Sequence, residues 1–402
     1  MAVELVEAVC RILAGFPDDA GCMQTDQAKV RFPNKNASDF VPDVRRRVNE
    51  YFGQSGLSRK ANAVMIAKTV LILASAVGTY LAILFGGFTP LQMLGLAILL
   101  GALMAGIGFC VAHDALHGAY SENPAVNRYL GNTFDLVGAN GYMWKITHNV
   151  IHHTYTNIDG IDEDLSVSPL LRLSPGAPHR RWQRLQHLYG FLAYSLATLN
   201  WVFAKDYAQF LKKDIGPYTN KSHPRSEVIK LLWTKAAVYA YTIVIPLLVL
   251  DVTWWQFLIG FLAMHVTAGT ILGVIFQLAH VVEGPEYPEP DADGTMEHQW
   301  IIHEMHTTAN FAGRNRLLSW YIGGLNYQIE HHLFPQVCSI HYPAIAGIVR
   351  ATAEEHGVPY HYHPTLRAAI ASHYRMLKVL GTPKLAHEVV SHVPRRDSSM
   401  SS

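Results

Sequence analysis

The sequence predicts an all-α, multi-pass membrane protein, with four transmembrane helices in two hairpins and a cytoplasmic helical cap rich in histidine. Three features of the composition lead to this fold class. Only 16% of the 402 residues are charged, whereas soluble proteins average about 25%. Hydrophobic residues make up 50% of the chain, and many lie in long uncharged runs. The 22 histidines are unusually many beside 31 acidic residues, and the net charge of +1 argues against a nucleic-acid-binding protein.

The first hairpin is predicted from the stretch between Thr69 and His113, which contains no charged residue. A helix that crosses the hydrocarbon core of a bilayer needs about 20 residues, so this stretch is long enough for two crossings. We expect helices at about residues 65–85 and 91–112, joined by the turn GGFTP. Lys68 lies inside the first of them, and we expect its long side chain to reach the membrane surface.

The second hairpin is predicted at about residues 236–250 and 255–279. The short connection carries Trp254 and Trp255, and tryptophan is typical of the membrane–water interface. A soluble protein with two buried helical hairpins is the alternative, although buried helices rarely run this long without charge. The apolar stretch at 188–204 contains Ser, Thr and Asn and has basic residues at both ends. We therefore expect it to lie in the interface or to re-enter the membrane rather than to cross it.

Lysine and arginine predict the orientation of the helices. The two tight connections contain neither residue, whereas the N-terminal segment, the middle segment and the tail are all basic. By the positive-inside rule, these three polar segments lie in the cytoplasm. We expect a cytoplasmic N-terminal segment at 1–60, a membrane-bound domain at 61–360 and a cytoplasmic C-terminal tail at 361–402. Both termini and the histidine clusters then lie on the cytoplasmic side.

The cysteines and the N-terminus exclude some classes of protein. Cys10, Cys22, Cys110 and Cys338 lie far apart without a CxxC spacing, which argues against a disulfide framework and against a thiolate metal site. The N-terminal run MAVELVEAVC is acidic and has no basic region before a long apolar core. We therefore expect no cleaved signal peptide.

Histidines recur at helical spacing near the predicted helix ends. In VAHDALHGAY, His113 and His117 are four residues apart and therefore share one helix face. In HNVIHH, His148 and His152 have the same spacing, while His153 lies about 100° further round the helix. Because adjacent histidines diverge in this way, the doublet suits two metal ions better than one.

The remaining candidates complete a predicted dimetal site. NYQIEHHLFP contains Gln328, His331 and His332, and His280 ends the fourth helix at the depth of His113. Imidazole suits Fe, Cu, Ni and Zn, and the lack of thiolates argues against structural zinc. Eight histidines are too many for one ion, so we expect a dinuclear site. The candidate metal ligands are His113, His117, His148, His152, His153, His280, His331 and His332.

Other histidines are interpreted more simply. A single histidine is more often a hydrogen-bonded residue than a ligand, and we assign that role to His187, His265, His341 and His392. His298, His303 and His306 are intermediate. Of these, His303 is the candidate for a further ligand or for a hydrogen-bond partner that orients a ligand.

At these residues the sequence resembles the membrane-bound fatty acid desaturase superfamily. HDALH, HNVIHH and QIEHH match its three histidine boxes in order, spacing and position, over roughly residues 62–360. The resemblance implies two iron ions that use O₂ and two electrons to abstract hydrogens from an acyl chain, presented as acyl-CoA or acyl-lipid. It assigns the box histidines as iron ligands, and His280 fits the ligand that the family carries outside the boxes. The domain at 61–360 is then a fatty acid desaturase domain.

The third box predicts the type of desaturase. Most of the superfamily begins it with His, whereas Gln328 stands here, as in the front-end (linoleoyl-CoA, delta-6-type) desaturases, and Gln328 is a possible weak ligand. Eukaryotic front-end enzymes often carry an N-terminal cytochrome b5 domain marked by HPGG, but no histidine precedes His113. We therefore expect a separate electron donor of the ferredoxin, rubredoxin or cytochrome b5 type. The same absence favours a bacterial inner membrane over the endoplasmic reticulum.

The substrate contacts are predicted less specifically. Tyr142, Trp144 and Trp320 are candidates for the lining of an acyl channel, although such aromatics often serve only as membrane anchors. Arg180, Arg181 and Arg184 suit either a substrate headgroup or anionic membrane lipid. Two alternatives stay open, namely a same-fold lipid or carotenoid hydroxylase or ketolase and, more remotely, a histidine-rich metal transporter.

Overall fold

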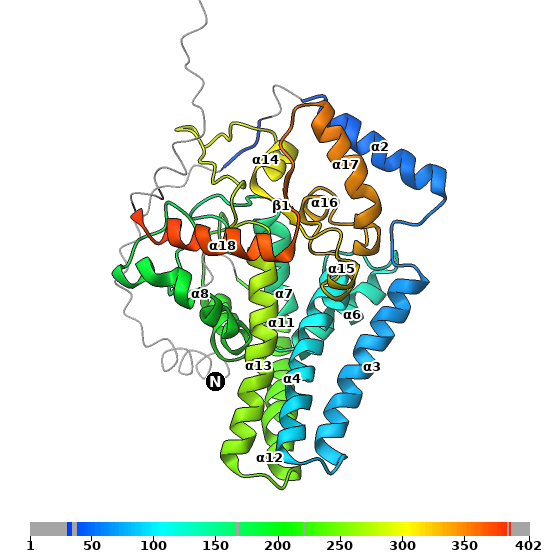
Figure 1. The fold of residues 1–402 in the computed structure, drawn as a ribbon, viewed down its shortest axis with the longest axis vertical. Coiled ribbons are helices and arrows are strands. Elements are labelled where there is room, and N and C mark those ends of the chain that lie inside the picture. The colour runs from blue at the N-terminus through cyan, green and yellow to red at the C-terminus, as the bar shows by residue number, and fades with distance from the viewer. Residues whose placement is uncertain (1–29, 34–37, 166–168, 220–221, 384–385, 387–402) are drawn as a thin grey trace, which may run out of the picture.

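A bundle of four long helices and a larger helical region, here called the cap, make up the computed structural model. The structure describes the chain except residues 1–29, 34–37, 166–168, 220–221, 384–385 and 387–402. Figure 1 shows the long helices side by side at one end of the molecule and the cap at the other. Among the described residues, four helices are long and apolar enough to cross a membrane. They are Ala63–Phe85, Pro90–Leu116, Arg225–Val249 and Trp254–Gln277.

The long helices contain the apolar stretches predicted from the sequence, and two of them contain π-helical turns. The first is α3 (Ala63–Phe85), and the last is α13 (Trp254–Gln277). The second and third each run through a π-helical turn into a further short helix. The second comprises α4 (Pro90–Ile107), η1 (Gly108–Ala112) and α5 (His113–Leu116), and the third comprises α11 (Arg225–Tyr239), η5 (Ala240–Val244) and α12 (Ile245–Val249).

The third long helix begins at Arg225, earlier than the predicted residue 236. Its two lysines explain the difference, because each is paired with an aspartate of the protein. Lys230 lies 3.0 Å from Asp135, and Lys235 lies 2.6 Å from Asp206. Lys68 corrects a second expectation. Its side chain is buried instead of extending outward, because its ammonium donates to the carbonyl oxygen of Trp320 at 3.2 Å and the residue is only 5% exposed.

Glycine allows the close packing of the bundle. α4 and α13 cross at Gly101, where a Cβ atom would overlap the carbonyl oxygen of Met264. The start of α4 is set by Thr89, whose hydroxyl accepts from the N–H of Gln92 while the Gln92 side chain accepts from the N–H of Thr89. This packing carries the end of α4 and its continuation in α5 into the cap.

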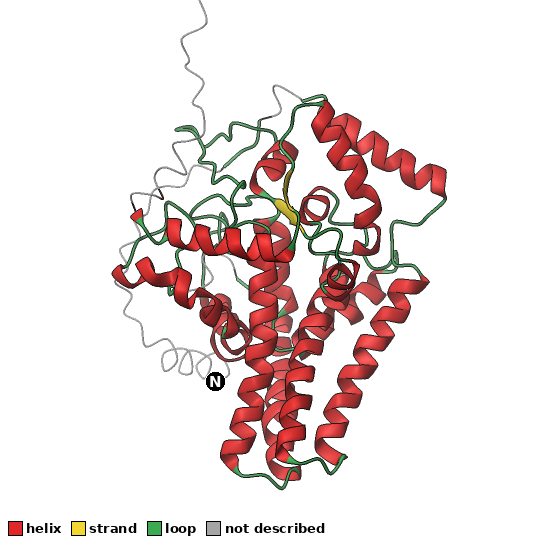
Figure 2. Ribbon diagram, viewed as in Figure 1, coloured by secondary structure: helices red, strands yellow, loops and turns green. Residues whose placement is uncertain are grey.

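The cap consists of short helices joined by long loops, as Figure 2 shows. Within the described residues, the strands that depart from the predicted all-α class are two parallel three-residue strands, β1 (Ala309–Phe311) and β2 (His361–His363). α2 (Phe40–Ser55) buries Phe40, Val44 and Val48 on one face, and it packs against α17 (Tyr342–Glu355). The other α-helices of the cap are α6 (Pro124–Leu136), α7 (Gly141–Trp144), α8 (Gln186–Ser195), α9 (Ala197–Asn200), α10 (Asp206–Leu211), α14 (Trp300–Thr307), α15 (Arg316–Tyr321), α16 (Gln328–Leu333) and α18 (Leu366–Leu380). Shorter π- or 3₁₀-helical segments are η2 (Lys145–His152), η3 (Arg181–Leu185), η4 (Trp201–Lys205) and η6 (Ser339–His341).

Candidate metal centre

The candidate ligands come from four segments that meet where the cap covers the bundle. Two of these segments follow or form π-helical turns, which are frequent at functional sites. Seven of the eight histidines are buried, and His117 is partly buried. Their positions are His113 in α5, His117 directly after it, His148 and His152 in η2, His153 directly after η2, His280 in the turn after α13, and His331 and His332 in α16.

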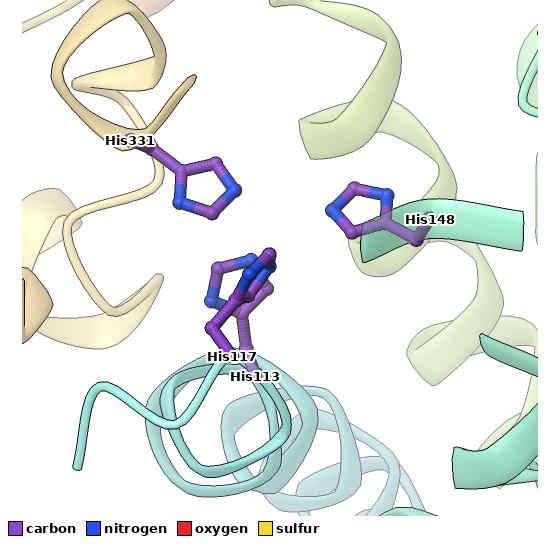
Figure 3. A group of neighbouring side chains, drawn as sticks. All are labelled: His113, His117, His148 and His331. Atoms are coloured by element: carbon purple, nitrogen blue, oxygen red, sulfur yellow. The ribbon is translucent and has the colours of Figure 1, made fainter. Parts of the chain in front are cut away.

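Seven of the histidines form two groups with the spacing of metal ligands. The first group is His113, His117, His148 and His331, and Figure 3 shows their rings turned toward a common space. The second group is His152, His280 and His332. Within each group the ligating nitrogens all lie within 4.8 Å of one another. The doublet in α16 is therefore divided, with one histidine in each group.

His153 lies between the two groups. Its ring centroid is 4.5 Å from that of His331 and 4.3 Å from that of His332. Both of its ring nitrogens are buried and have no hydrogen-bond partner among the described residues. The two groups together with His153 therefore account for all eight candidates that the sequence identifies.

The hydrogen bonds around the histidines fit a metal centre. Asp164 accepts from Nδ1 of His148 at 2.8 Å, and Glu304 accepts from Nδ1 of His332 at 2.7 Å. Because a carboxylate can only accept, each Nδ1 carries the proton and each Nε2 keeps a free lone pair. In the described structure no protein group pairs with these Nε2 atoms, nor with those of His113, His117 and His331. Neutral nitrogens that face inward in this way are well suited to bind a metal ion.

The electrostatics of the site favour neutral imidazoles. Burial, reinforced by the neighbouring imidazoles, lowers the pKa of His148, His331 and His332. Burial also lowers the pKa of His280, to about 3. His152 is different: burial lowers its pKa, but Asp162 at 2.9 Å outweighs burial and raises the pKa to about 9. A metal ion must displace a proton there, and the carboxylate then balances part of the charge of the ion.

Comparison with known proteins identifies the family of this chain. The family model described as fatty acid desaturase matches residues 88–364. The chain belongs to the fatty acid desaturase family. It is therefore an oxidoreductase that acts on acyl chains, and the predicted resemblance to this family is confirmed.

The relatives of this desaturase cover most of its length. It is 37% identical to the sn-1 linoleoyl-lipid 6-desaturase of Synechocystis, over 88% of this chain and 98% of the relative. It is 36% identical to the enzyme of the same name from Arthrospira platensis, over 89% of this chain and 96% of the relative. It is 32% identical to the acyl-lipid (8-3)-desaturase of Physcomitrium patens, over 90% of this chain and 76% of the relative.

The partners that orient the histidines of the desaturase were not identified from the sequence. Asp162 and Asp164 hold His152 and His148, and they lie in the run IDEDL just after the second box, where acidic residues beside a histidine box are a usable signal. Glu304 and Tyr342 hold His332 and His331 from distant segments. Only the fold brings these last two residues to the site.

Some histidines lie outside both groups. The Nε2 atom of His303 donates to the carbonyl oxygen of Thr156 at 2.8 Å, so His303 supports the loop after the second box. His265 lies 3.1 Å from the hydroxyl of Thr198, which fits the expected hydrogen-bonded role. His341 donates to the carbonyl oxygen of Lys60, and His187 packs against Tyr374. His392 lies outside the described residues.

A cavity of about 650 Å³ adjoins the histidines. Its lining includes His148, His152, His280 and Gln328, apolar residues from several elements, and charged residues such as Asp164 and Lys205. Trp144 is part of the lining and stacks on His148 with ring centroids 4.3 Å apart. Two other channel candidates lie outside the described lining. Tyr142 is hydrogen-bonded to His223, and Trp320 is in α15 and contacts Lys68.

Replacing Glu304 with glutamine is expected to weaken metal binding by about 10- to 100-fold, as is typical when a ligand loses its orienting partner. The amide keeps the shape of the side chain but replaces one carboxyl oxygen with an NH₂ group, which weakens the acceptor that holds Nδ1–H of His332 at 2.7 Å. Metal content after dialysis against graded chelator measures the effect. The exposed Glu297→Gln variant is the control and is expected to match the wild type. Equal metal retention in both variants would show that Glu304 does not orient a ligand.

Proposed function

We propose that the protein is a di-iron, front-end acyl-lipid desaturase. It inserts a cis double bond between an existing double bond and the carboxyl end of a lipid-linked acyl chain. The observation that carries the proposal is the pair of buried histidine groups beside a largely apolar cavity. Two relatives are named sn-1 linoleoyl-lipid 6-desaturase, so a linoleoyl lipid is the first substrate to test. An acyl-CoA is the alternative substrate.

We infer that the metal is iron and that the box histidines and His280 hold it. The first group offers four nitrogens, and the second group offers three, with His153 beside both. When bound, two irons would supply the O₂ activation and hydrogen abstraction that breaking unactivated C–H bonds requires. The reaction removes two hydrogens from adjacent methylenes and converts O₂ to two water molecules, with two electrons from the donor and two protons from water. Gln328 lines the same cavity and is placed to act as a weak ligand or through a bound water.

The residues of this chain position the acyl chain and keep water away from it. The cavity wall beside the histidines is formed by the indole ring of Trp144 and by Phe276. Apolar walls of this kind bind a hydrocarbon chain through the hydrophobic effect and hold its methylenes near the metal. A chain of fixed position relative to the ions explains why one methylene pair reacts and others do not.

The orientation and domain limits also belong to this proposal. We place the cap in the cytoplasm, preferably at a bacterial inner membrane, because the basic segments are on the side of the cap. The desaturase domain is proposed at 61–360, with flanking cytoplasmic segments at 1–60 and 361–402, both of which include undescribed residues. Electrons are proposed to come from a ferredoxin, rubredoxin or cytochrome b5 type protein. Dependence of the activity on one of these donors tests that part directly.

Expression in a host with a simple fatty acid profile is the decisive test of function. Cells fed linoleate or α-linolenate are expected to gain a fatty acid with a new double bond near the carboxyl end, detected by gas chromatography of methyl esters. An unchanged profile in the presence of a working electron donor would contradict the proposal. A hydroxylated product would favour the hydroxylase or ketolase alternative. Metal flux in proteoliposomes without any lipid product would favour a transporter, although transporter ligands usually lie near the midplane of the membrane.

A further inference from the structure

We propose that the acyl chain reaches the metal centre sideways from the bilayer, through an opening bordered by a lipid-embedded segment made of η3, α8 and α9. This inference rests on the proposed function, because it requires a substrate that is already a membrane lipid. It concerns how the chain enters the cavity, which is independent of where the double bond is made.

Contacts with α13 show how deep this segment lies. Thr198 of α9 donates its hydroxyl to the carbonyl oxygen of His265 at 2.9 Å. His265 lies twelve residues before the end of α13 at Gln277, which at the helical rise of 1.5 Å is about 18 Å along the helix axis. At Gly269, a Cβ atom would overlap the carbonyl oxygen of Ser195. The segment therefore descends beside α13 to the middle of a helix that is apolar enough to span a bilayer.

The exposed face of the segment is suited to lipid. Leu185, Leu188, Leu192 and Leu196 recur at intervals of three and four residues, and they are 57%, 64%, 68% and 44% exposed. A helix with this pattern presents one apolar face. Arg181 and Arg184, at the N-terminal end of the segment, are exposed and suit anionic headgroups. Depth beside α13 and this basic flank favour the bilayer over a second copy of the chain as the partner of the leucine face.

The same segment forms the rim of the cavity. Trp182, Leu196 and Asn200 are exposed and also line the cavity, whose lining includes the buried His148 and His280. Two small side chains, Ala193 and Ala197, lie in the lining on the same side. Small residues at this place leave room for a hydrocarbon chain between the segment and α13. The cavity is therefore open where the segment faces lipid.

Arg180 completes the rim on the cap side. Its guanidinium lies 5.3 Å from the ring of Trp182, and the residue is exposed and lines the cavity. A cation beside an aromatic ring at this level suits a phosphate or ester group of a lipid whose chain lies in the cavity. The rival route begins in water at Lys212, which lies 3.5 Å from Glu163 and is also part of the rim. A water-soluble acyl-CoA would use that route.

Blocking the lipid-facing rim tests the proposal. In the full chain reconstituted in vesicles with a linoleoyl phospholipid and an electron donor, Ala197→Trp is expected to lower conversion by about 10-fold or more while metal content is retained. Leu192→Trp is the matched control, because Leu192 is exposed on the same segment but is outside the described cavity lining. It is expected to convert at the wild-type rate. Equal conversion by both variants would overturn lateral access and leave the proposed function intact.

A depth measurement keeps the inference testable if Ala197→Trp loses its metal or its fold. Spin labels are attached at Leu192→Cys and Arg181→Cys after Cys10 and Cys22 are replaced with serine; Cys110 and Cys338 are buried. The label at 192 is expected to relax more with O₂ than with a water-soluble nickel chelate, and the label at 181 should show the reverse. Stronger relaxation by nickel at 192 would refute the lipid-embedded segment. A wild-type protein that converts no lipid would instead contradict the proposed function, and the depth result would be unaffected.

Discussion

Replacing His152 with alanine is expected to abolish desaturation and to remove the bound metal at the same time. His152 belongs to the group with only three histidines, and its ring lies 4.7 Å from that of His280 and 5.1 Å from that of His332. The substitution also leaves Asp162 buried without its imidazole partner. The loss should exceed the roughly 10- to 100-fold that follows removal of an orienting partner, because a ligand itself is lost.

Iron content and lipid products are measured on the same preparation. His187→Ala is the control, since His187 packs against Tyr374 outside both histidine groups. It is expected to keep full iron content and activity. Asp162→Asn should lie between the two, because it keeps a hydrogen-bond acceptor for His152 but removes the charge. Full iron content in His152→Ala would show that the ligand set is wrong, even if activity were lost.

Replacing Lys235 with alanine is expected to destabilise the protein by about 3–5 kcal/mol, the typical cost of leaving one charge of a buried pair uncompensated. The ammonium of Lys235 lies 2.6 Å from Asp206, and it also donates to the carbonyl oxygens of Gly138 and Trp201. Both members of the pair are buried, at 3% exposure each. One side chain thus joins the third long helix to α10, to η4 and to the loop after α6.

Thermal unfolding in a fixed detergent measures this effect. The exposed Lys213→Ala variant is the control and is expected to change stability by no more than about 0.5 kcal/mol. Joint replacement of Lys235 with methionine and Asp206 with leucine should recover most of the loss, since an apolar pair leaves no unpaired charge. A Lys235→Ala protein as stable as the wild type would mean that Asp206 is satisfied without the lysine.

Much of the fold could be predicted because it depends on local pattern. Each long helix contains a predicted apolar run, and its ends agree with the prediction to within a few residues except at Arg225. That helix extends further because Lys230 and Lys235 are neutralised by Asp135 and Asp206, which are distant in the sequence. The prediction for Lys68 was wrong because its side chain also has a partner distant in the sequence, a carbonyl oxygen of α15.

The histidine boxes were likewise visible in the sequence, but their grouping was not. Helical spacing determines that His113 and His117 share one face, and adjacency determines that His331 and His332 diverge. Which of the two metal-ligand groups a histidine joins does not follow from local spacing. It depends on distances between α5, η2, α16 and the end of α13, and packing alone sets these distances. Glu304 reaches His332 from a separate helix in the same way.

The sequence by itself therefore determined the long apolar helices, the family and the candidate ligands, because hydrophobic runs and helical periodicity act within one segment. The tertiary structure decided which histidines meet, which carboxylates hold them, and that Trp144 rather than Tyr142 or Trp320 lines the cavity. It also placed the leucine face of α8 beside the cavity rim. These features depend on contacts between segments far apart in the chain, and only close packing of the whole molecule fixes them.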